Sequence, residues 1–133
     1  MREPPIRVLA VGPAPEPEGA DLEVERADGL PAALARLEGG GVDVALVPLA
    51  LGREAIAAVR ERAPEVPLVA VADEDEGLAA LEAGAHDVVP PGADPALLRR
   101  AIRYARSLHR LEAELHQHRT VDELTGLYNA RGF

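Results

Sequence analysis

The stretch VDVALVPLALGREAIAAVRERAPEVPLVAVA, residues 42–72, decides the fold. Its two ends, 42–47 and 68–72, are nearly continuous apolar runs, as is typical of strands that are buried on both faces. Between them, residues 53–62 place Ile56 and Val59 on one face of a helix. A strand, a helix and a second strand in this order form a parallel crossover, so the stretch predicts an α/β protein.

The same alternation continues on both sides of this stretch. Further strands are expected at 6–11, 22–27 and 87–89. The run at 22–27 alternates strictly, as a half-exposed edge strand does. Further helices are expected at 32–37, at 76–83, and from Pro95 onward with Asp94 as the N-cap. The sequence therefore predicts a five-stranded parallel sheet that ends in a long C-terminal helix.

One connection lacks room for its helix. Only residues 13–21 separate the first two strands, with prolines at 13, 15 and 17. A helical crossover needs roughly 10 to 12 residues, and alternate prolines exclude a helix interior. We therefore expect an extended connector in place of the first helix. The apolar side chains uncovered by this loss must be covered by a partner subunit, by the last helix or by the connector itself.

Composition excludes several classes of function. The 133-residue chain has a formal net charge of −9, which disfavours a nucleic-acid partner. All 14 basic residues are arginine, and cysteine is absent, so a Walker P-loop and thiolate chemistry are excluded. The only hydroxyl side chains of the Ser and Thr type are Ser107, Thr120 and Thr125. No apolar run can span a bilayer and no signal peptide is evident, so a cytoplasmic location without a membrane partner is expected.

The stretch GAHDVVPPG (84–92), followed by LLRRAIRYA (97–105), resembles two-component receiver domains. In that family the matching stretch is similar to GAxDYLxKG followed by LLxRAIRYA. The resemblance covers about residues 6–107 and is specific in its second half. It implies a receiver-like, flavodoxin-like sheet, here without the first helix.

The resemblance also implies a chemistry, which this chain departs from at every position. Receivers accept a phosphoryl group on an aspartate after the third strand, with a magnesium ion held by an acidic pair after the first strand. A Ser or Thr ends the fourth strand and a Lys follows the fifth. The matching positions here are Pro48 for the acceptor, Pro13 and Ala14 for the pair, Ala72 for the hydroxyl and Pro91 for the lysine.

Residues 1–95 contain no Lys, Ser or Thr, so no shift of alignment supplies these groups. We therefore predict a pseudo-receiver with no metal, no cofactor and no phosphorylation by the family's route. An unconventional acceptor, such as Asp43 or Asp73, remains an alternative.

The stretch DELTGLYNARGF (122–133) resembles the opening of a GGDEF-type diguanylate cyclase domain, commonly DxLTGLxNRRxF, with Ala130 as the departure. The residues that match are Asp122, Leu124, Thr125, Gly126, Leu127, Asn129 and Arg131. That family's catalytic residues lie far downstream of this motif. We therefore expect this chain to be a non-enzymatic piece of a longer protein, whose catalytic part is a diguanylate cyclase.

Apolar residues recur every four and three positions along the last helix, as in a coiled coil. They are Leu97, Ala101, Tyr104, Leu108, Leu111, Leu115 and His118. We predict a parallel homodimer through this seam, with the earlier positions also packing on the sheet. The expected divisions are a pseudo-receiver at 1–107, a coiled-coil signalling helix at 108–121 and a GGDEF fragment at 122–133.

Other polar clusters are expected to be structural. His109, His116 and His118 are predicted to be solvated, because no carboxylate or cysteine cluster completes a zinc site. The acids at 73–76 are expected to cap the following helix and to favour its positive end. Arginines at 99, 100, 103, 106 and 110 are expected to pair with Glu112, Glu114 or the acids of a partner.

Together these features predict a dimeric regulatory module that controls a C-terminal diguanylate cyclase, with an upstream signalling protein as a further partner. A cyclase of that family joins two GTP molecules held on facing domains, so activity depends on how two chains are held together. The alternative is a stand-alone protein-interaction adaptor derived from a receiver domain.

Overall fold

A computed structural model describes the backbone of residues 4–126 and the side chains of residues 4–115. Five strands form one parallel sheet in the order β2-β1-β3-β4-β5. They are β1 (Ile6–Val11), β2 (Leu22–Ala27), β3 (Val44–Pro48), β4 (Leu68–Val71) and β5 (Asp87–Val89). The predicted five-stranded parallel sheet and the edge position of residues 22–27 are confirmed. The third strand begins two residues later than its apolar run.

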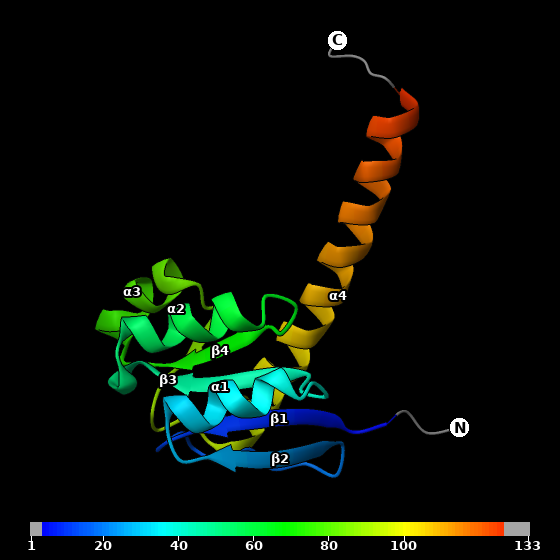
Figure 1. Cartoon of the computed structure of the whole chain (residues 1–133). Helices are drawn as coiled ribbons and strands as arrows, with labels where there is room; N and C mark the ends of the chain where they lie inside the picture. Colours follow the sequence, from blue (N-terminus) through cyan, green and yellow to red (C-terminus); the bar gives the residue numbers. More distant parts are fainter. Residues whose placement is uncertain (1–3, 127–133) are drawn as a thin grey trace.

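Three helices cover one face of this sheet: α1 (Leu30–Glu38), α2 (Arg53–Arg62) and α3 (Gly77–Ala83) (Figure 1). Short 3-10 turns, η1 (Leu49–Leu51) and η2 (Glu74–Glu76), precede α2 and α3. Ile56 and Val59 of α2 are fully buried on this face, as their spacing predicts. Alternate residues of the strands pack against Ile56 and Val59 on this face, because successive side chains in a strand point to opposite faces of the sheet.

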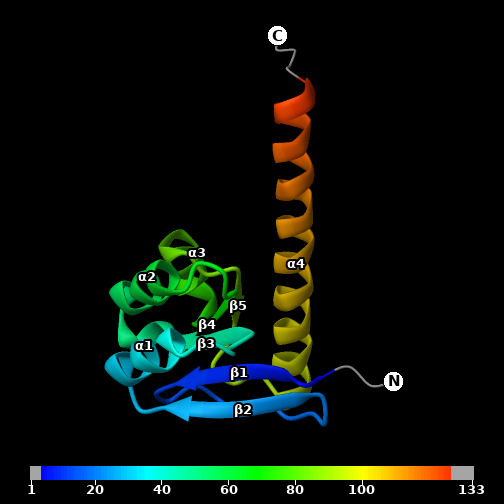
Figure 2. The same cartoon turned by 45° about the vertical axis from the view of Figure 1, so that its right-hand side comes forward.

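The opposite face is covered by one helix, α4 (Pro95–Gly126), which continues far beyond the sheet (Figures 1 and 2). Its start is fixed by Asp94, whose Oδ1 accepts a hydrogen bond from the Leu97 amide at 2.8 Å. The side chains of α4 that pack on the sheet are Leu98, Ala101, Ile102 and Ala105. Their spacing of three and four residues is that of one helix face.

The connector between β1 and β2 contains no helix, as its prolines predict. Ala14 and Pro17 of this connector are buried, and Ala14 packs in the same cluster as Val8 and Ala10 of β1. Val8 is 1% exposed and Ala10 is 0% exposed. The face left by the missing helix is therefore closed within the chain, by α4 and the connector together, and a partner subunit is not needed to cover it.

None of the helices in the described part of the chain is both long enough and apolar enough to cross a bilayer.

The packing of α4 on the sheet generates the first prediction. Ile102→Ala removes a fully buried side chain and is expected to lower the free energy of unfolding by about 2 to 5 kcal/mol, because a cavity remains. Leu78→Ala, at a leucine of α3 that is 67% exposed, is the matched control and should change it by less than about 0.5 kcal/mol. Urea unfolding followed by circular dichroism measures both. Equal effects of the two substitutions would contradict the assignment of α4 to the core.

Candidate functional site

The structure brings the predicted switch positions together at the carboxyl edge of the sheet. Pro48 ends β3, is buried, and pairs with Val71 of β4. Ala72 follows β4 and donates its amide hydrogen to the Val89 carbonyl at 2.9 Å. Pro91 is exposed just after β5. The three positions lie at the ends of neighbouring strands, yet none of these side chains carries an oxygen or a charge.

The two alternative acceptors lie in different places. Asp43 lies at the start of β3, at the amino edge of the sheet, and its Oδ2 accepts the Arg7 amide at 2.9 Å. It is therefore remote from the carboxyl edge. Asp73 is exposed at the carboxyl edge, where it precedes η2 without making a side-chain cap. The hollow of about 380 Å³ beside it is lined by residues that are mostly apolar: Ala72, Glu74, Gly77, Val88 and Pro90.

A guanidinium group lies at this edge that the sequence analysis missed. Arg26, near the end of β2, donates from Nη1 to the carbonyls of Gly12 at 2.7 Å and Ala14 at 2.9 Å. Its Nη2 lies 3.5 Å from Oε1 of Glu16. Arg26 thus holds the connector against β2, and it places a fixed positive charge beside the end of β1.

Helix α4 leaves a second apolar stripe exposed to solvent. Leu97 is 41% exposed, Tyr104 54%, Leu108 57%, Leu111 54% and Leu115 61%. We call these five residues the α4 seam. Ala101, predicted to belong to the same interface, is only 6% exposed and packs on the sheet. The sheet covers Ala101, as expected for the earlier positions of the stripe, whereas Leu97 and Tyr104 do not pack on the sheet as that expectation required. The side chain of His118 lies outside the described residues.

The two stripes on α4 point in different directions. With 3.6 residues per turn, the α4 seam is rotated by roughly 100° from the stripe formed by Leu98, Ile102 and Ala105. The sheet therefore cannot cover the seam, which runs beside the domain at Leu97 and continues past it to Leu115.

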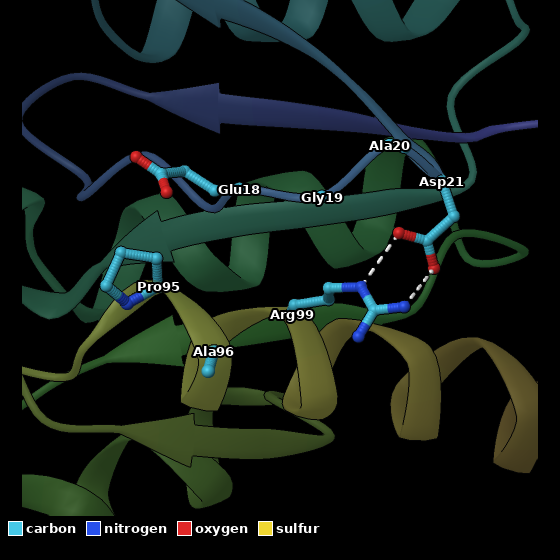
Figure 3. Close-up of a pocket in the computed structure, with 7 residues that line it drawn as sticks. All are labelled: Glu18, Gly19, Ala20, Asp21, Pro95, Ala96 and Arg99. Atoms are coloured by element: carbon cyan, nitrogen blue, oxygen red, sulfur yellow. Dashed lines mark hydrogen bonds and ion pairs between the residues drawn. The ribbon is translucent and has the colours of Figure 1, made fainter.

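A salt bridge joins the end of the connector to α4 (Figure 3). Nε and Nη2 of Arg99 donate to the two carboxylate oxygens of Asp21 at 2.8 and 3.1 Å. Arg103 approaches the same carboxylate at 3.8 Å. Gly19 permits this arrangement, since a Cβ there would lie 2.7 Å from Cδ of Arg99. The bridge closes one end of a groove of about 470 Å³, lined also by Glu18, Ala20, Pro95 and Ala96.

Comparisons with known proteins agree with this architecture. No family model matches the chain, and no curated protein matches it. Among solved structures, NtrX from Brucella abortus in complex with ADP has a TM-score of 0.72 at 17% identity. The match covers 86% of this chain and 29% of that one, so the chain spans under a third of NtrX.

Two shorter structures match over nearly their whole length. A CheY-like response regulator receiver domain protein from Methanospirillum hungatei JF-1 has a TM-score of 0.66 at 20% identity, over 81% of this chain and 98% of that one. A response regulator from Thermotoga maritima has a TM-score of 0.66 at 17% identity, over 77% and 98%. The chain has the receiver fold. At these identities the likeness establishes the fold alone.

The arginine stripe of this receiver-like chain is only partly paired. Arg99 and Arg103 bind Asp21, and Arg100 lies over the ring of Tyr104 at 5.2 Å. Within residues 4–115, no ion pair forms between these arginines and Glu112 or Glu114, so that part of the expectation is wrong. Pairing with the acids of a partner stays a prediction.

Two histidines and a glutamate meet where α4 leaves the receiver sheet. His86 from the turn before β5 and His109 and Glu112 from α4 bring one nitrogen or oxygen each within 4.8 Å of one another. The sequence analysis missed this group because His86 is far from the other two along the chain. Among the described residues, the acids at 73–76 form no comparable group.

The motif that resembles a cyclase opening begins within α4. The helix backbone includes Asp122, Leu124, Thr125 and Gly126, with Gly126 as its last residue. The side chains of these four residues, and all of Leu127, Asn129 and Arg131, lie outside the described residues.

Two pairings in the receiver lower the pKa of a carboxyl group. The hydrogen bonds from Arg99 hold the pKa of Asp21 below its ordinary value of 3.8, against a smaller opposing effect of burial. The Arg36 guanidinium likewise lowers the pKa of Glu25. A carboxyl group with a lowered pKa stabilises the fold above its unfolded-state pKa, and this contribution is lost as the pH falls through the folded value.

The Arg99–Asp21 bridge generates a pH-dependent prediction. Asp21→Asn should lower the urea midpoint of unfolding at pH 7, and the difference from the unsubstituted chain should shrink as the pH falls below about 4. The effect is small because both side chains are well exposed to solvent. Asp75→Asn, at an exposed residue of η2, should leave the midpoint unchanged. A difference for Asp21→Asn that stays constant from pH 7 to pH 3 would show that the charge of Asp21 contributes nothing.

Proposed function

We propose that this chain is a regulatory receiver-like module that is not phosphorylated by the family's route and acts by holding two copies together along α4. In this proposal the signal passes mechanically, through the position of α4, and reaches a C-terminal diguanylate cyclase domain. An upstream signalling protein supplies the input.

The α4 seam is the observation that carries the proposal. Five large apolar side chains on one helix face are between 41% and 61% exposed, and a face of this kind usually marks an interface. From Arg106 to Leu115, where the described side chains end, no residue of α4 joins the core of the sheet. A helix that continues without a core is marginal alone, and a second copy of the same seam is the partner that heptad spacing favours.

The carboxyl edge supports the absence of phosphorylation. Phosphoryl transfer needs an oxygen that accepts the phosphoryl group and a cation placed beside the negatively charged oxygens of that group. Pro48, Ala72 and Pro91 supply neither. The cation nearest to the end of β1, Arg26, is engaged by two carbonyls and Glu16.

The continuity of α4 supports control of a following domain. The helix runs unbroken from the sheet to Gly126, so about 30 Å of helix separates Ala105 from the end of α4. A tilt or shift of α4 on the sheet is therefore carried to the motif at 122–133. In a dimer, the same movement changes how two following domains face each other.

Dimerisation is tested by a charge placed in the seam. Leu108→Glu should convert the chain from dimer to monomer at tens of micromolar, because two carboxylates would face each other across the interface. Sedimentation equilibrium over a concentration series measures the mass. Leu78→Glu, at the exposed leucine of α3, is the matched control and should stay dimeric. A monomeric unsubstituted chain at the same concentrations would remove the basis of the proposal.

Phosphorylation is tested with a small phosphodonor. Incubation with acetyl phosphate and magnesium should leave the intact mass unchanged, because the side chains of Pro48, Ala72 and Pro91, at the positions that match the family's acceptor, hydroxyl and lysine, carry no oxygen and no charge. A receiver with a complete acidic pocket, treated alongside, shows that the donor is active. If the mass of a phosphoryl group is added, peptide mapping of the product would reveal whether Asp73 is the acceptor, and the proposal would fail.

A further inference from the structure

The group formed by His86, His109 and Glu112 has the chemistry of a metal site. Imidazole nitrogens and a carboxylate oxygen are the ligands that zinc and related divalent ions take in proteins. One ligand atom from each residue lies within 4.8 Å of the other two, so one ion can contact all three after small side-chain movements. His109 and Glu112 are three residues apart, which places them on the same face of α4.

The two histidines are packed against each other rather than free in solvent. Their rings meet edge to face with centroids 5.8 Å apart, and both side chains are half-buried. Burial, with smaller contributions from Arg60 and His109, lowers the pKa of His86, while Glu112 opposes this effect. A lowered pKa favours the neutral ring, which is the form that binds a metal.

We propose that His86, His109 and Glu112 bind one divalent transition-metal ion, represented by zinc, and that the ion ties the turn before β5 to α4. Three protein ligands leave a fourth tetrahedral position for water. The site involves neither the α4 seam nor the carboxyl edge, so it stands independently of the proposed function.

Binding has a specific consequence for the backbone. Nδ1 of His86 accepts the Leu68 amide hydrogen at 3.0 Å, so the hydrogen of the neutral ring resides on Nε2. When Nε2 binds the ion, that hydrogen moves to Nδ1 and the Leu68 bond is lost, with no change in the number of ring hydrogens. The site thus gives up one hydrogen bond on binding, and its affinity is lower than that of a site whose histidines are already oriented.

The ion would also extend the part of α4 that is fixed to the domain. Among the described side chains, Ala105 is the last residue of α4 in the core, and Glu112 lies two turns beyond it. A bond between the β5 turn and this point restrains the direction in which α4 leaves the sheet.

Calorimetric titration of the tag-free 133-residue chain with zinc chloride at pH 7.5 tests the site. We expect one ion per chain, and a loss of affinity of about tenfold or more for His109→Gln and for Glu112→Gln. Both substitutions lie on the outer part of α4 and should leave the far-UV circular dichroism unchanged. The Leu68 amide resonance in a ¹⁵N-labelled chain should shift with the first equivalent of zinc.

Two control variants separate this site from zinc binding by α4 alone. Glu114→Gln and the double variant His116→Gln with His118→Gln should both bind zinc as the unsubstituted chain does. Binding that survives His86→Gln and disappears in the double variant would overturn the proposal, because the ion would then be held without the β5 turn. The absence of zinc binding by the unsubstituted chain would overturn it directly.

Discussion

The packing of a single helix on one whole face of the sheet is the constraint on which the rest of the structure depends. The connector with its prolines cannot form a helix, so α4 covers most of that side, and Ala14 of the connector covers the part beside β1. Ile102 and Leu98 are the largest α4 side chains buried there. Because α4 is fixed by this stripe, every other apolar residue on it is held at a set angle to the domain. The α4 seam faces solvent for that reason.

The connector contributes more than a link between two strands. Ala14 fills part of the space of a helix, Arg26 binds the backbone of the connector, and the Arg99–Asp21 bridge ties its end to α4. These contacts come from β2, from the connector and from α4, so they couple the three segments. A partner that displaced the connector would therefore also disturb the seating of α4.

The hydrophobic periodicity and the positions of glycine and proline predicted the strands, the helices and the absence of a helix between the first two strands. Strand and helix patterns differ most clearly in long apolar runs. The N-cap at Asp94 was predicted for the same local reason. The same pattern did not separate the two stripes of α4, since a spacing of three and four residues suits a core stripe and a coiled-coil seam equally: Ala101 packs on the sheet and Tyr104 does not. Arg26 and the His86 group escaped prediction because their partners are brought together only by the order of the strands and the path of α4.

The two stripes on α4 limit the kind of movement that can carry a signal. Spinning the helix about its axis would bring the half-exposed seam under the sheet and would expose Ile102, which the close packing of the core opposes. A tilt of α4, or a slide of α4 along the surface of the sheet, keeps Ile102 and Ala105 covered while it moves the far end of the helix. Under the proposed function, the helix therefore acts as a lever whose fixed end is the sheet. Any contact that restrains α4 just beyond Ala105, where His109 and Glu112 lie, acts at the point where that lever leaves its support.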